Sequence, residues 1–163
     1  MENIIAILKE ANTKLNTADH LAYVTYPVVK ESKLLLTTVE NLYTALILAM
    51  EALLQYDRYY KRISYVPHEF QSKYEIFKKI SMKYNLDRMA IASMLDIRSL
   101  LELHKKSPMV FTREQKLVIA SQGFNIIKTL NIDMVKRYIE QAKPLISKIN
   151  KVIQPNANDR RLA

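Results

Sequence analysis

The chain has 163 residues, with 25 lysines and arginines against 16 acidic residues, so its formal net charge at pH 7 is +9. It contains one glycine and no cysteine, which excludes disulfides, thiolate metal sites, glycine-rich phosphate loops and folds with many tight turns. Apolar residues make up 49% of the chain, enough for one hydrophobic core. We expect a single helical domain over residues 1–153 and a flexible tail over residues 154–163.

Hydrophobic residues recur at helical spacing in the first part of the chain. They predict a helix over residues 2–15, a break at Asn16-Thr17, and a second segment that Pro27 kinks or ends. A long helix is predicted over residues 28–63, and its apolar girth is typical of a central bundle helix. Its uncharged run over residues 41–50 is too short to cross a bilayer. We therefore expect a soluble cytoplasmic protein that does not enter a membrane.

Three further helices are predicted in the rest of the chain. Two of them cover residues 68–84 and 86–105, and Asn85 can end the first and cap the second. The final helix follows the cap Asn131 and bends at Pro144. Together these elements predict an all-α fold, an antiparallel helical bundle of four long helices plus shorter ones.

The segment between the last two helices fits two structures. Residues 112–115 match a capping box, which would begin a helix. Residues 110–111 and 117–119 are β-prone and flank these polar residues, which is typical of a hairpin. We favour a small β-hairpin near residues 109–121, with Gly123 in the turn that follows.

Arg98 and His104 bring a cation and an imidazole together in one predicted helix. Six residues turn an α-helix by about 600°, so the two side chains point roughly 120° apart and share a site only through a common groove. The alternative is a surface pair between Arg98 and Glu102, with His104 interacting with the negative end of the helix dipole. Spacing alone favours this alternative.

The same segment resembles the HEPN family (higher eukaryotes and prokaryotes nucleotide-binding), small helical bundles with a motif of arginine, four to six residues, then histidine. Arg98, five residues and His104 satisfy that spacing, and the order of helices is similar over residues 17–153, most of all to small archaeal members of unassigned role. The resemblance implies a homodimer and metal-independent RNA cleavage, with His104 as general acid/base and Arg98 as phosphate clamp. Ser99 stands where active members carry a small amide or acid, and Ser99 and Glu102 would support the pair.

A second basic pattern predicts a nucleic-acid interface. Cations that hold phosphates alternate with aromatic rings that stack on bases in Arg58, Tyr59, Tyr60, Lys61 and Arg62. Lys105 and Lys106 extend the basic surface beside the motif. The alternative is a helix end whose tyrosines pack on the core and whose cations are solvated, and the usual half-burial of tyrosine favours it.

Three functions follow from these patterns together with the resemblance to the HEPN family. The first is a binding module, a homodimer that engages RNA, another polyanion or a protein. The second is a metal-independent endoribonuclease, and the third is a structural subunit that pairs with a nucleotidyltransferase-like partner. We expect no metal and no cofactor, because His20, His68 and His104 are far apart and the sequence has no Glu-x-x-His pair.

Overall fold

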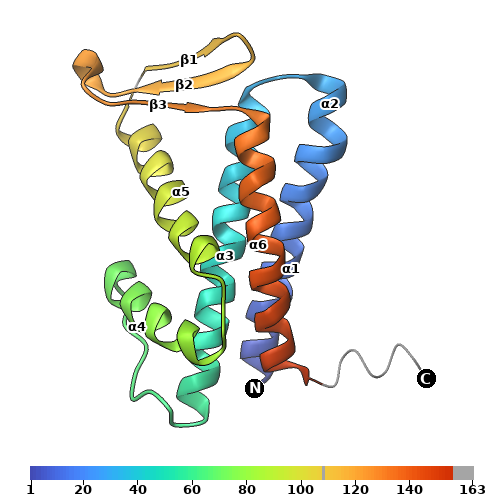
Figure 1. Ribbon diagram of the computed structural model, residues 1–163, viewed down its shortest axis with the longest axis vertical. Coiled ribbons are helices and arrows are strands. Elements are labelled where there is room, and N and C mark those ends of the chain that lie inside the picture. The colour runs from blue at the N-terminus through green and yellow to red at the C-terminus, as the bar shows by residue number, and fades with distance from the viewer. Residues whose placement is uncertain (108, 156–163) are drawn as a thin grey trace.

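The computed structural model describes residues 1–107 and 109–155. These residues fold mostly into helices, with a small antiparallel sheet across one end (Figure 1). The helices are α1 (Glu2–His20), α2 (Tyr26–Val29), α3 (Lys33–Tyr59), α4 (Phe70–Lys83), α5 (Arg88–Lys106) and α6 (Ile132–Ile153). The strands are β1 (Met109–Arg113), β2 (Lys116–Ala120) and β3 (Ile127–Leu130). The prediction of a mainly helical domain is confirmed, but the sheet means that the fold is not purely α.

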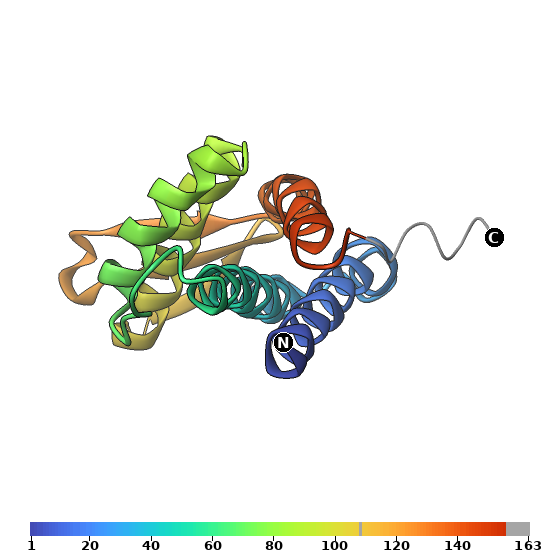
Figure 2. The same ribbon diagram turned by 90° about the horizontal axis from the view of Figure 1, so that it is seen from below.

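Helix α3 is the centre of the fold. Helix α1 packs along it, α6 contacts both, and α5 contacts α3 and α6 on the other side (Figure 2). Among the helices of the described residues, α3 is the one long and apolar enough to cross a membrane, and 44% of that apolar stretch is buried in the fold. Its apolar residues therefore supply a large part of the hydrophobic core.

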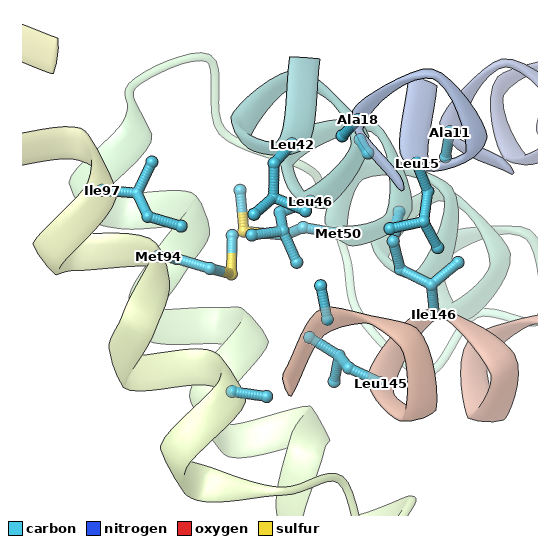
Figure 3. Close-up of a cluster of buried hydrophobic side chains, with 14 of the residues drawn as sticks. Ala11, Leu15, Ala18, Leu42, Leu46, Met50, Met94, Ile97, Leu145 and Ile146 are labelled. Atoms are coloured by element: carbon cyan, nitrogen blue, oxygen red, sulfur yellow. The ribbon is translucent and has the colours of Figure 1, made fainter. Parts of the chain in front are cut away.

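The core is built where these helices face one another. Figure 3 shows side chains from α1, α3, α5 and α6 meeting there: Ala11, Leu15, Ala18, Leu42, Leu46, Met50, Met94, Ile97, Leu145 and Ile146. Small alanines on α1 let that helix approach α3 closely, and leucines and methionines fill the wider space towards α5. This packing fixes α5 against α3, and these two helices form the candidate site described below.

The predicted helix break at Asn16-Thr17 is wrong. Helix α1 runs through both residues, because the Thr17 hydroxyl donates to the carbonyl of Thr13 at 3.0 Å and buried Ala18 continues the apolar stripe. The helical path then widens into a π-helical turn over Leu21–Thr25, and Pro27 lies in the first turn of α2, which follows.

The ends of the later helices show which sequence signals for caps were correct. Helix α3 begins at Lys33, five residues later than predicted, because Lys30 has a left-handed backbone (φ 53°). Asp87, and not Asn85, caps α5 by accepting from the backbone N–H of Met89 at 3.0 Å. Asn131 caps α6 as predicted, accepting from Met134 at 2.8 Å.

The sheet confirms the predicted hairpin and adds a strand that the sequence did not predict. Strands β1 and β2 pair antiparallel around the turn Glu114–Gln115, whose residues both have positive φ, and β3 pairs with the other edge of β2. Gly123 has φ 83° in the next turn, as its position predicted. Leu117, Ile119 and Leu130 face the helices and join the core. The predicted tail over residues 154–163 lies, beyond Pro155, outside the described residues.

Candidate functional groove between α3 and α5

Arg98 is held at a junction of three helices. Its guanidinium donates to the Tyr43 hydroxyl on α3 at 3.1 Å and pairs with Glu102, one turn further along α5, at 3.0 Å. The guanidinium carbon also lies 4.0 Å from the centre of the Phe70 ring on α4. The surface pair with Glu102 is therefore present as the spacing predicted, but it is only one of three contacts. Because these contacts restrain a side chain that is still 35% exposed, Arg98 has a defined direction.

Arg98 and His104 line the same groove. It encloses about 330 Å³ between α3 and α5, and its wall is formed by Glu40, Tyr43, Thr44, Arg98, Leu101, Glu102, His104 and Lys105. His104 is half-buried in the last turn of α5. The wall carries two cations, Arg98 and Lys105, and two carboxylates, Glu40 and Glu102, so the groove offers charged hydrogen-bonding groups of both signs.

The other residues predicted around the motif are only partly brought together. The Ser99 hydroxyl accepts a hydrogen bond from the Lys128 ammonium of the sheet at 3.0 Å, so it is engaged with the sheet and not with the Arg98 guanidinium. Lys105 lies in the groove wall, and Lys106 is exposed at the end of α5. Glu102 is the supporting residue that does contact Arg98.

Arg62, predicted to bind nucleic acid, is engaged in an ion pair. Its guanidinium lies 3.2 Å from the carboxylate of Asp57, which is 1% exposed, and 2.9 Å from the Tyr84 hydroxyl. The Tyr84 hydroxyl also donates to Asp57. Burial, and then this hydrogen bond, raise the pKa of Tyr84 to about 12, and the hydrogen bond with Asp57 raises the pKa of Arg62. This cluster ties the end of α3 to the end of α4.

The tyrosines beside Arg62 pack mainly on one another. Tyr60 makes edge-on contacts with Tyr56 and Tyr59, at centroid distances of 4.9 and 5.2 Å, and Arg62 lies over the rings of Tyr56 and Tyr60. Tyr56 packs against the core as the sequence alternative predicts, but Tyr60 is 49% exposed and Arg62 is ion-paired rather than solvated. Tyr59, Arg58 and Lys61 are exposed to solvent.

A second cavity, of about 560 Å³, lies between the end of α3 and the start of α4. Arg58 lines it together with Tyr65, His68, Glu69 and Lys73. Lys73 is paired with Glu51 at 2.7 Å. No local sequence pattern groups these residues, because they come from two elements and the loop between them. Glu51 and Arg58 lie two turns apart on the same face of α3, and this spacing is the sequence signal that could link them.

Within residues 1–107 and 109–155, no three His, Cys, Asp or Glu side chains cluster closely enough to hold a metal ion. Comparison of the chain with protein-family models, with curated proteins and with solved structures found no match. The function therefore has to be argued from the groove itself.

Proposed function

We propose that the protein is an RNA-binding module that holds a phosphate of single-stranded RNA in the groove between α3 and α5. The observation that carries this proposal is that Arg98 and His104 line one groove although their spacing on α5 sets them apart. The resemblance of this arginine–histidine spacing to the HEPN motif supports the same choice of ligand.

Arg98 is suited to the role of phosphate clamp. A guanidinium has five N–H donors in a planar fork, and the contacts with Tyr43 and Glu102 use two of them. A donor fixed in advance loses little conformational entropy when a phosphate binds. Tyr43 and Phe70 therefore act as positioning residues for Arg98.

The charge of the groove sets how strong the binding can be. Lys105 adds a cation, while Glu40 and Glu102 oppose an approaching phosphate. The net charge of +9 on the whole chain supplies long-range attraction. We therefore expect modest affinity that falls steeply as salt is added.

The test is fluorescence anisotropy with a short labelled single-stranded RNA, titrated at several salt concentrations. Arg98→Ala is expected to weaken binding by about ten-fold, the effect of losing one charged contact of about 1.4 kcal/mol. Lys105→Ala is expected to lower the salt slope by about 0.7, the value for one phosphate contact on a single strand. Lys9→Ala is the matched control, because it removes the same charge from an exposed position on α1. Equal affinities for Arg98→Ala and Lys9→Ala would exclude the groove as the RNA site.

The shared groove also supports a second candidate, a metal-independent endoribonuclease. His104 would move a proton to or from the reacting ribose and phosphate oxygens, and Arg98 would stabilise the charge that develops on the phosphate. RNA cleavage that persists with a chelator and is lost in His104→Ala, but not in His20→Ala at an exposed position on α1, would establish this activity. If RNA stays intact with the wild-type protein, the endoribonuclease is excluded and the binding module is the remaining candidate.

A further inference from the structure

The edge of the sheet formed by β1 is open. All five β1 residues are exposed, and no strand in residues 1–107 or 109–155 pairs with the side of β1 that faces away from β2. An open apolar edge strand is a template for pairing with another chain, and proteins usually cover, shorten or charge such an edge. In β1 the charge is confined to one end, at Arg113, while Met109, Val110 and Phe111 are apolar and the Thr112 hydroxyl shares a hydrogen bond with that of Ser32.

The hairpin register shows which backbone groups are free for pairing. The two-residue turn makes Arg113 and Lys116 the first hydrogen-bonded pair, and such pairs recur at every second residue. The backbone groups of Phe111 therefore face β2, while those of Val110 and Thr112 face outward. The open edge thus presents two N–H donors and two carbonyl acceptors with one residue between them.

The apolar surface of β1 continues on the face of the sheet that points away from the helices. Phe111 lies opposite Val118, and Met109 lies opposite Ala120, which in turn faces Ile127 on β3. Val118 and Ala120 are buried but lie outside the helical core, so they belong to this outer face. Phe111 is 44% exposed and Ile127 is 55% exposed.

We propose that β1 pairs antiparallel with β1 of a second copy of this chain, in a register centred on Phe111. In that register Val110 of each copy lies opposite Thr112 of the other, so the outward-facing groups form four backbone hydrogen bonds. The two Phe111 side chains meet at the two-fold axis on the outer face, where cross-strand aromatic pairs are stabilising. The two three-stranded sheets become one six-stranded sheet.

A second copy fits this edge because the strand is complementary to itself. Arg113 of one copy lies opposite Met109 of the other, so the two arginines stay four residues apart, about 14 Å along the strand. That separation exceeds a Debye length of about 8 Å at physiological salt, so their repulsion is screened. The middle of the edge offers no cation to a nucleic acid. This inference goes beyond the proposed function and does not depend on RNA binding.

The first experiment uses the absence of cysteine from the chain. Phe111→Cys places two thiols at the two-fold axis, and mild oxidation is expected to convert most of the protein into a covalent dimer. Ile127→Cys is the control, since it lies exposed on the same sheet face but two strands from the edge. Crosslinking that is equally weak, or equally strong, in the two variants would overturn the proposed register.

The second experiment measures the molar mass by light scattering from about 1 μM to about 100 μM protein. The wild type is expected to dimerise, whereas Phe111→Lys and Phe111→Glu are each expected to be monomeric, and their mixture to restore a dimer. Phe111 lies outside the core, so both variants should keep the helical circular dichroism of the wild type. A wild type that stays monomeric throughout, or loss of RNA affinity in Phe111→Lys without any change in mass, would refute the pairing with a second copy.

Discussion

The cluster of Asp57, Tyr84 and Arg62 gives a sharp test of the structure, through the substitution Tyr84→Phe. This change removes one hydroxyl and leaves Asp57, a carboxylate that is 1% exposed, with Arg62 as its remaining side-chain partner. A buried polar group that loses a hydrogen bond costs about 1–3 kcal/mol of stability, with the upper part of the range for charged groups. We expect the free energy of unfolding to fall by about 2 kcal/mol.

Urea unfolding followed by circular dichroism measures this loss. With a slope of about 2 kcal/mol per molar urea, the unfolding midpoint should fall by about 1 M. Tyr65→Phe is the matched control, because Tyr65 is 62% exposed and its substitution should leave the midpoint within about 0.25 M of the wild type.

The wild type and Tyr84→Phe should also differ in how their stability depends on pH. The folded-state pKa of Tyr84 is raised from 10.0 to about 12, so the fold favours the neutral phenol. This stabilisation is fully present below pH 10 and is lost as the pH rises from about 10 to about 12. The stability difference between the wild type and Tyr84→Phe should therefore shrink over that interval. Other tyrosines with raised pKa values cancel in this difference, because both proteins contain them.

Two results would refute the reasoning about this cluster. One is an unfolding midpoint for Tyr84→Phe that equals that of Tyr65→Phe at pH 7. The other is a stability difference between wild type and Tyr84→Phe that stays constant from pH 9 to pH 12, since it would mean that the Tyr84 proton is not linked to folding.

Three further predictions test the core, a helix cap and the groove. Leu53→Ala, at a fully buried position of α3, should lower the free energy of unfolding in urea by about 2–5 kcal/mol. Leu95→Ala, at an exposed position of α5, should lower it by less than about 1 kcal/mol. Equal losses in the two variants would contradict the packing of the core. Asn131→Ala should cost about 1 kcal/mol by removing the cap of α6, and an unchanged midpoint would contradict that cap. Glu102→Gln should tighten RNA binding a few-fold at low salt, by about 0.2–1 kcal/mol, because it removes a negative charge beside Arg98. Weaker binding in anisotropy would mean instead that Glu102 is needed to orient Arg98.

Local signals in the sequence were enough for several parts of the fold. Asn131 has a side chain that can cap a helix and precedes a regular apolar repeat, and the structure confirms that cap. Strand β3 was not predicted, because Ile127–Leu130 is only four residues long and its pairing with β2 is a tertiary contact. The break at Asn16-Thr17 was predicted from polar side chains alone, although a threonine hydroxyl can bond to the preceding turn and leave the helix intact.

The candidate site was predictable only as far as residues on one helix can indicate it. Spacing identified Arg98, Glu102 and His104, but Tyr43 and Phe70 come from other helices and no local pattern connects them to Arg98. The sequence predicts a nucleic-acid contact for Arg62 because its neighbours are aromatic and basic. Its ion pair with Asp57 could have been suspected, because Asp57 continues the buried stripe of α3 three residues after Leu54.

The π-helical turn at Leu21–Thr25 resets the direction in which side chains point along the helical segment that runs from α1 into α2. Four residues overshoot a full turn of a regular α-helix by about 40°, so two such steps in succession, from Ala18 to Ala22 and on to Tyr26, would rotate the tyrosine ring out towards water. A turn closed by the bond from the Tyr26 N–H to the Leu21 carbonyl holds one more residue, which removes that excess rotation and returns Tyr26 to the interior at 7% exposure. Shortening the arm by one residue here would move every later side chain about a quarter of the way round the axis, and Tyr26 would no longer face the core.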